Sequence, residues 1–437
     1  MAAAGMDRLS SGAASLGTAE IIAVGSELLG SSRIDTNSLF LAGRLASLGI
    51  ELRAKAVVGD DRARLASVFK TALGRADLVI LTGGLGPTDD DLTREVVAAV
   101  LGLEAREDPA IVAEIEQRFA RRGLRMPQVN RRQAMVPVGA SALDNPNGTA
   151  PGLFIEHDGR VIVLLPGPPR ELQPMFDGLC SGALRARVGS ARIRTETLFV
   201  AGRGESHVEE IAQPIYSRWT TETRPIETTI LAMPGQVELH LTLRSDDEDA
   251  GAHRLREARD ELAAALGRDV FSTDGRSMEE VVGALLRQCG LTISAAESCT
   301  GGLLLSRLTD VPGSSDYVIG GAVAYSNPAK TDLAGVPPAL IEAHGAVSEP
   351  VAVALADGIS ARTGSRVALG ITGIAGPGGG TPLKPVGTVV IALTGREIAA
   401  QVRTFSFFGG RPQVKFQATQ AALDMVRRHL QSAKPPE

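Results

Sequence analysis

Short apolar runs of strand length recur along the chain, and segments with apolar residues at helical spacing lie between them. The clearest runs are LVILT at 78–82, VIVLL at 161–165 and VALGIT at 367–372, none of which carries a charged residue. An uncharged strand is typical of a sheet that helices cover on both faces. The alternation therefore predicts an α/β fold with parallel sheets and right-handed crossovers.

The chain has 437 residues, more than one hydrophobic core usually serves, so we expect several domains. In its middle the pattern changes to one-sided strands such as VELHLTL at 237–243, followed by a charged amphipathic helix over 253–266. We predict two three-layer α/β/α domains, over residues 19–180 and 278–432. A small α+β domain over residues 190–273 should lie between them in the sequence.

Composition narrows the class of protein. Aromatic residues make up 3% of the chain and the net charge is −5, so a stacking surface or basic groove for nucleic acid is not expected. Its three cysteines are widely spaced and suggest no disulfide framework, which favours a reducing compartment. No apolar run approaches the roughly 20 residues that span a bilayer. We expect a cytoplasmic protein that does not enter membranes.

Ser298, Cys299 and Thr300 precede Gly301-Gly302 where a predicted strand turns into a helix. Free backbone N–H groups at such a turn can hold a phosphate or stabilise an oxyanion, and a hydroxyl there is well placed to attack a carbonyl. The same pattern also suits an ordinary helix cap by Ser or Thr. The Cys299 thiol is a rival nucleophile, because a helix N-terminus lowers the pKa of a thiol.

Two further stretches in this part of the chain carry unusual residues. Tyr325 and Lys330 lie in GAVAYSNPAK, and either could take the proton from a serine nucleophile. Taken alone, Tyr325 fits a half-buried packing residue and Lys330 a solvated surface charge. A glycine-rich loop at 370–380 follows a buried strand, where glycines allow a ligand to approach the backbone.

The stretches occur together in a specific order, which resembles the C-terminal domain of the CinA (competence/damage-inducible) family. The matching words are AESCTGG at 296–302, AYSNPAK at 324–330, GAVSEP at 345–350, TGIAGPGGG at 372–380 and KPVGTV at 384–389. Stand-alone members of this domain family are nicotinamide mononucleotide amidohydrolases, which release ammonia and nicotinate mononucleotide in pyridine nucleotide salvage. The resemblance therefore implies the same activity here.

By this resemblance Ser298 is the nucleophile, and Tyr325 and Lys330 assist it as base or hydrogen-bond partners. The substrate contacts that it implies are Cys299, Thr300, Gly301, Gly302, Thr372, Gly373 and Arg411. Ser298 would attack the carboxamide carbon while N–H groups near Thr300–Gly302 stabilise the oxyanion, and this route needs no cofactor.

Glycines also follow two predicted strands in the first half, in GSELLGSSRIDTN at 25–37 and TGGLGPTDDDLT at 82–93. With the aspartates at 89–91 they suit a phosphate-bearing ligand and a divalent cation. An alternative is that Asp89–Asp91 only caps and charges the first turn of a helix.

These words, together with NPNGTAPG at 145–152 and LPGPPRE at 165–171, resemble the CinA N-terminal domain, which is related to molybdopterin-binding proteins of the MoaB/Mog type. Some relatives hydrolyse ADP-ribose with a divalent metal, and others bind a pterin nucleotide. The family often has a glycine where Ser31 stands, and here Gly30 comes one place earlier. The implied site residues are Glu27, Asp35, Asn37, Gly83, Gly84, Thr88, Asp89 and Asp90, with Asp90 as the ligand of Mg²⁺ or Co²⁺.

The main expectation is thus a two-headed enzyme whose C-terminal site deamidates a small nucleotide. An ADP-ribose pyrophosphatase at the N-terminal site is the alternative, as is a non-catalytic pterin- or nucleotide-binding protein of competence. The resemblance also implies a homodimer and allows a recombination or competence protein as partner.

Overall fold

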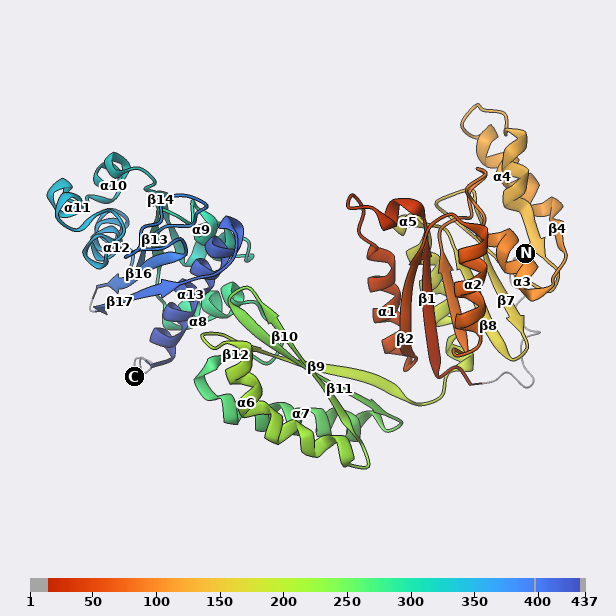
Figure 1. Ribbon diagram of the computed structural model, residues 1–437, viewed down its shortest axis with the longest axis horizontal. Helices are drawn as coiled ribbons and strands as arrows, with labels where there is room; N and C mark the ends of the chain where they lie inside the picture. The colour runs from red at the N-terminus through yellow and green to blue at the C-terminus, as the bar shows by residue number, and fades with distance from the viewer. Residues whose placement is uncertain (1–14, 397, 433–437) are drawn as a thin grey trace. The chain divides into compact units, whose positions relative to one another are not determined.

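Three sheets of four or more strands occur in the part of the chain that the computed structural model describes, residues 15–396 and 398–432. Two compact units contain them (Figure 1). One unit comprises Met1–Arg194 with Leu243–His253, and the other comprises Thr195–Thr242 with Arg254–Glu437. The mixed α/β class that the sequence predicts is confirmed.

The first sheet has six strands in the order β2-β1-β3-β8-β7-β6. Its strands are β1 (Thr18–Val24), β2 (Glu51–Val58), β3 (Leu78–Thr82), β6 (Ser141–Leu143), β7 (Gly152–His157) and β8 (Arg160–Leu165). The helices of this part are α1 (Thr36–Leu48), α2 (Arg62–Leu73), α3 (Thr93–Leu101), α4 (Pro109–Ala120) and α5 (Pro169–Ser181). One core cluster joins the sheet to α1 and α5 and another joins it to α2 and α3, so the sheet has a helical layer on each face.

The prediction of an all-parallel sheet is wrong for this domain. The β2-β1-β3-β8 pairings are parallel, but β7 runs antiparallel to β8 and β6 antiparallel to β7. Asp158 and Gly159 connect β7 to β8, and both have positive φ, 47° and 73°. Such an Asp-Gly pair forms the tight turn of a hairpin, which reverses the chain without a crossover helix.

The second sheet has the order β10-β11-β9-β12. Along the chain, one helix follows β9 and another follows β11. Its elements are β9 (Arg192–Val200), α6 (Glu205–Tyr216), β10 (Ile226–Met233), β11 (Gln236–Ser245), α7 (Glu248–Leu266) and β12 (Val270–Ser272). Buried and partly buried residues alternate along β11, as expected for a strand with one face against helices. This β-α-β-β-α-β arrangement is the ferredoxin-like motif.

The third sheet has five strands in the order β14-β13-β15-β16-β17. Its strands are β13 (Ile293–Glu297), β14 (Val318–Val323), β15 (Val367–Gly373), β16 (Thr388–Gly395) and β17 (Ile398–Ser406). The helices are α8 (Met278–Cys289), α9 (Leu303–Thr309), α10 (Asn327–Ala334), α11 (Pro338–His344), α12 (Glu349–Thr363) and α13 (Arg411–Ser432). Here too the parallel prediction fails in part, since β16 and β17 run antiparallel to their neighbours. Separate core clusters lie on the two faces of the sheet.

Helix α13 connects the third sheet to the strand β12 of the second. Arg427 on this helix is fully buried, forms a 2.6 Å ion pair with Asp424, and donates to the backbone oxygen atoms of Arg268 and Val270. A buried guanidinium needs all of these partners, because desolvation without them is costly. Among the described helices, none is long and apolar enough to cross a membrane.

We predict that Arg427→Met lowers the stability of this unit by on the order of 3 kcal/mol, roughly 6–12 °C in melting temperature, because it leaves buried acceptors unpaired. Scanning calorimetry measures the change. Arg218→Met is the control, since Arg218 pairs with Glu261 at the surface and should cost less than about 1 kcal/mol. Equal melting temperatures for the two variants would contradict the prediction.

Candidate functional site

A sharp turn over Ser298–Gly302 leads from β13 into α9. Gly301 and Gly302 have φ of 62° and 89°, the left-handed region that glycine adopts without strain. Gly302 is the N-cap of α9, and neither Ser298 nor Thr300 caps this helix, so the interpretation of either residue as a helix cap is wrong. Ser298 instead faces a cleft at the end of the sheet.

Lys330 contacts this serine from α10, which packs on the opposite face of the third sheet from α9. It lies on α10, whose N-cap Ser326 accepts a hydrogen bond from the N–H of Ala329. Only 2% of Lys330 is exposed, and its Nζ lies 3.0 Å from Ser298 Oγ and 3.0 Å from the Tyr325 carbonyl oxygen. The interpretation as a solvated surface charge is therefore wrong. Burial lowers the pKa of Lys330, which favours the neutral amine that a base requires.

Tyr325 also lines the cleft, but its hydroxyl contacts Arg411 and not Ser298. The residue is 56% exposed, so it is not the half-buried packing residue that its setting suggested. Its hydroxyl accepts a 2.7 Å hydrogen bond from Arg411, which also donates to the Gly376 carbonyl at 2.8 Å. Of the two expected partners of the serine, Lys330 contacts its hydroxyl in the structure and Tyr325 contacts Arg411.

The Cys299 thiol differs from its sequence-based expectation. Cys299 is 5% exposed, and burial raises the pKa of its thiol to about 12. The expected lowering by a helix N-terminus is wrong because desolvation dominates and the neighbouring Glu297 carboxylate acts in the same direction. The thiol is thus protonated near neutral pH, which disfavours Cys299 as the nucleophile.

The cleft has a volume of about 260 Å³. Its lining comprises Ser298, Cys299, Tyr325, Asn327, Lys330, Ala346, Val347, Thr372, Gly373, Ile374, Ala375, Gly376, Gly378, Gly379 and Arg411. Arg411 is a cation in this lining, which holds no Asp or Glu, so the cleft suits an anionic ligand. Asn327, Ala346 and Val347 were not expected, although they lie within the AYSNPAK and GAVSEP words.

Two side chains from separate segments hold one wall of the cleft. Thr372 Oγ1 donates to the Ala346 oxygen at 2.7 Å, and Lys384 Nζ donates to the next oxygen, of Val347, at 2.6 Å. Thr372 thus lines the cleft, but its hydroxyl proton is donated to the Ala346 oxygen. Lys384 is the first residue of the KPVGTV motif, to which the sequence analysis assigned no role.

Three expected substrate contacts do not line the cleft. Thr300 is fully buried behind it. The N–H of Gly301 donates to the Ser298 oxygen at 3.1 Å, and that of Gly302 to the Glu297 carboxylate at 3.0 Å. The sequence-based assignment of Gly301 and Gly302 as oxyanion donors is therefore wrong, because the turn folds inward and uses their N–H groups.

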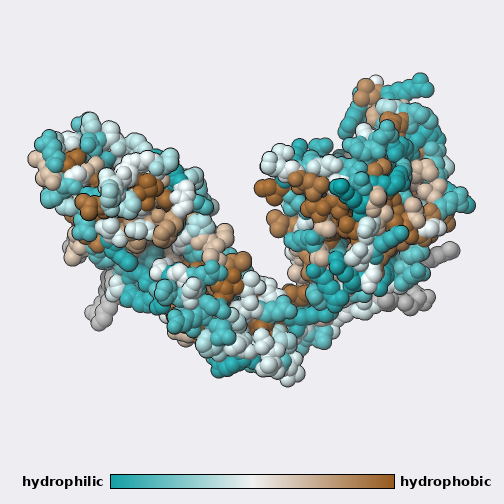
Figure 2. Space-filling model, viewed as in Figure 1, coloured by the Kyte–Doolittle hydropathy of each residue, from teal (hydrophilic) through white to brown (hydrophobic). Residues whose placement is uncertain are grey.

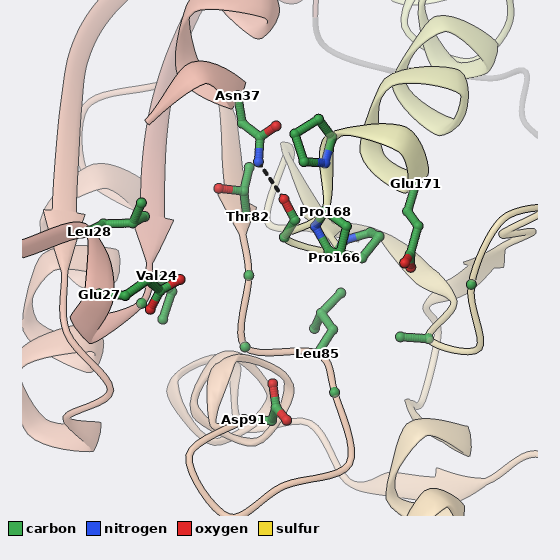
Figure 3. A pocket seen from close by; sticks show the side chains of 18 of the residues that line it. Val24, Glu27, Leu28, Asn37, Thr82, Leu85, Asp91, Pro166, Pro168 and Glu171 are labelled. Carbon is green, nitrogen blue, oxygen red and sulfur yellow. Dashed lines mark hydrogen bonds between the residues drawn. The ribbon is translucent and has the colours of Figure 1, made fainter. Parts of the chain in front are cut away.

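A larger pocket of about 850 Å³ opens at the carboxyl ends of β1, β3 and β8 (Figure 3). Of the expected site residues, those that line it are Glu27, Asp35, Asn37, Gly83, Gly84 and Asp90. Gly83 is required by close packing, since a Cβ there would lie 2.2 Å from the Val24 oxygen. The side chain of Asp35 caps α1 by accepting from the N–H of Ser38.

Thr88 and Asp89 do not line this pocket, contrary to expectation. Asp89 is turned outward into a 2.8 Å ion pair with Arg132, and Thr88 donates through both its N–H and its hydroxyl to Asp91. Helix α3 begins at Thr93 without a side-chain cap, so the capping interpretation of Asp89–Asp91 is also wrong. These aspartates instead close a turn before the helix.

Carboxylates approach the pocket from separate segments of the chain. Figure 3 shows Glu27, Asp91 and Glu171 on different walls. Glu171, which the sequence analysis did not assign, is 9% exposed and accepts a 2.8 Å hydrogen bond from Asn145. These two residues fall in the LPGPPRE and NPNGTAPG words, which were the available signal.

Exposed apolar side chains gather just before α1 and on its first turn (Figure 2). Leu29, Ile34 and Leu39 are 58%, 83% and 63% exposed, and Ile34 also lines the pocket. The pocket lining therefore includes one exposed aliphatic side chain of this group, that of Ile34.

The pocket does not contain a preformed metal site. Within residues 15–396 and 398–432, no group of three or more His, Cys, Asp or Glu side chains is arranged to hold a metal ion. The nearby Thr88 hydroxyl, whose hydrogen bond in the structure goes to Asp91, and the backbone N–H of Asp90 lower the pKa of Asp90, so its carboxylate is ionised. One carboxylate suffices for Mg²⁺ only where substrate phosphates supply further ligands, and the residues fit a metal of that kind.

Both ends of the chain match known domain families. The CinA C-terminal domain model matches residues 275–430, and a model described as "Probable molybdopterin binding domain" matches residues 20–186. A CinA-like protein of Koribacter versatilis is 51% identical over 420 residues, which is 94% of this chain and 99% of the relative. The chain belongs to the CinA family.

The chain is also similar to two further proteins. A competence-damage inducible protein of Symbiobacterium thermophilum is 47% identical over 423 residues, 94% of this chain and 98% of that protein. The crystal structure of CinA from Thermoplasma acidophilum is 33% identical and covers 37% of this chain and 96% of its own, with a TM-score of 0.35.

We predict that Cys299 resists alkylation in the folded protein. With a pKa of about 12, about one thiol in ten thousand is ionised at pH 8, so iodoacetamide should react about a thousandfold more slowly than with an unfolded cysteine. Mass spectrometry of the peptide measures this rate. Protein unfolded in urea is the control, and rapid modification of Cys299 in the native protein would show that its thiol is accessible and ionised.

Proposed function

We propose that the C-terminal site is a nicotinamide mononucleotide amidohydrolase, with Ser298 as the nucleophile and Lys330 as its base. The observation that carries the proposal is the buried Lys330 amine 3.0 Å from Ser298 Oγ. A serine hydroxyl is a weak nucleophile unless an adjacent base removes its proton, and a desolvated lysine can do so.

The reaction proceeds in two halves. Neutral Lys330 takes the Ser298 proton as Oγ bonds to the carboxamide carbon, giving a tetrahedral intermediate. The protonated lysine then gives its proton to the nitrogen, the C–N bond breaks, and ammonia leaves an acyl-serine. Water attacks this ester as Lys330 again takes the proton, and the protonated lysine then gives it to Oγ as the C–Oγ bond breaks, which releases the nicotinate product and free Ser298.

The charge and size of the cleft support a mononucleotide substrate. Lys330 already acts on the serine, so Arg411 is the lining cation left for the substrate phosphate, and a planar guanidinium binds phosphate well. A cleft of about 260 Å³ is near the lower end of small-molecule sites, which suits one nucleotide better than a dinucleotide.

The N-terminal pocket supports a second candidate activity, hydrolysis of ADP-ribose. Its volume of about 850 Å³ suits a dinucleotide-sized ligand, and Asp90 offers an ionised carboxylate at its wall. A divalent cation held there by Asp90 and the substrate phosphates would neutralise charge during diphosphate cleavage. Binding of a pterin or nucleotide without catalysis is the remaining alternative.

We predict that the wild-type protein releases ammonia from nicotinamide mononucleotide and that Ser298→Ala lowers kcat at least about a thousandfold. Lys330→Met should lower it about 100- to 10,000-fold, because the base is lost. An ammonia-coupled assay measures both. Absence of ammonia release from folded wild-type protein would exclude the proposed activity.

The pH dependence should follow Lys330. Because only the neutral amine can accept a proton, kcat/KM rises with pH through the pKa of Lys330, which burial places below the ordinary value of about 10.4. A pH profile of the wild type measures the midpoint. A rate that does not change with pH up to 10 would show that Lys330 is not the base.

For the N-terminal site, we predict Mg²⁺- or Co²⁺-dependent cleavage of ADP-ribose that Asp90→Asn lowers by at least about tenfold. Asp89→Asn is a matched control, since the neighbouring carboxylate faces outward to Arg132 and does not line the pocket. Chromatography of the nucleotide products measures cleavage. Equal activity of the two variants would argue against Asp90 as a metal ligand.

A further inference from the structure

The residue before the nucleophile carries a buried carboxylate that the proposed reaction does not use. Glu297 is the last residue of β13 and is fully buried. Its two oxygen atoms accept three backbone N–H groups, from Gly302 at 3.0 Å, Leu304 at 3.1 Å and Leu305 at 2.9 Å. The carboxylate thus binds the first turn of α9 from behind the cleft.

These three hydrogen bonds take the place of the cationic side chain that usually pairs with a buried carboxylate. In the described part of the chain no Lys, Arg or His forms an ion pair with Glu297, so the three N–H groups carry the cost of its desolvation. The Ser298–Gly302 turn must therefore pass over the carboxylate, and its conformation is tied to the position of Glu297.

The same contacts determine which N–H groups of the turn are available. The N–H of Ser298 donates to the Ile371 oxygen at 2.9 Å, and those of Gly301 and Gly302 are also occupied. Among the described residues, the N–H of Thr300 has no partner and that of Cys299 contacts only its own sulfur. These are the two N–H groups that directly follow the nucleophile.

We propose that Glu297 is a positioning residue, which holds the N–H groups of Cys299 and Thr300 where they stabilise the oxyanion formed at Ser298. This inference rests on the proposed serine chemistry but not on the identity of the substrate. It also implies that the N-terminus of α9 is filled by the carboxylate, so a substrate phosphate binds elsewhere in the cleft.

A fluorophosphonate probe tests this role without the substrate, because it forms a tetrahedral adduct with an activated serine that uses the same oxyanion donors. We expect Glu297→Gln to label at Ser298 at least about tenfold more slowly than the wild type, since an amide cannot accept all three N–H groups. Glu279→Gln is the matched control: Glu279 also contacts α9, through a 2.7 Å bond to Arg307, but not the turn. It should label within about twofold of the wild type.

A second readout separates positioning from loss of structure. In a Ser298→Ala background, adding Glu297→Gln should change the dissociation constant of nicotinamide mononucleotide by less than about twofold, while kcat falls in the single variant. If Glu297→Gln does not fold, Glu297→Asp replaces it, and its shorter side chain should also slow labelling.

Several outcomes would overturn the inference. They are wild-type labelling rates in folded Glu297→Gln or Glu297→Asp, an equal loss in Glu279→Gln, or weakened nucleotide binding with kcat unchanged. Failure to label wild-type Ser298 at all would overturn it as well. Rapid wild-type labelling without ammonia release would refute only the proposed substrate and leave the role of Glu297 to be judged by the labelling rates.

Discussion

The buried carboxylate of Glu297 and its three N–H partners determine the form of the C-terminal site. A charge at the end of a covered strand is stable only if its hydrogen bonds are complete, and here the turn that follows completes them. This arrangement sets the direction in which α9 leaves the sheet. Ser298, the next residue along the chain after Glu297, lines the cleft within hydrogen-bond distance of Lys330.

Single strands and helices were predictable because their buried positions carry apolar residues at the spacing of a strand or a helix. The uncharged LVILT run is β3, with the predicted bounds. Strand direction was not predictable from the alternation alone, because the Asp158-Gly159 turn inserts a hairpin. The family words located the residues of both pockets, but the outward turn of Asp89 depends on Arg132, 43 residues away.

The chemistry of a residue was harder to predict than its place. Lysine is a hydrophilic residue, and nothing in the AYSNPAK word shows that α10 will bury the Lys330 amine. Glu297 belongs to the word that drew attention first, yet its role requires the course of α9 in three dimensions. Tertiary contacts, rather than neighbours in the sequence, decide where such groups lie and which protonation state they hold.

One physical cause explains the choice between the two adjacent nucleophiles. Desolvation of this cleft lowers the pKa of Lys330, which makes the amine a better base for the Ser298 hydroxyl. The same desolvation raises the pKa of the Cys299 thiol, with Glu297 acting in the same direction, and so keeps the sulfur protonated. A dry site therefore activates the oxygen through its base and suppresses the sulfur, which would need to ionise by itself. Opening the cleft to water would weaken both effects together.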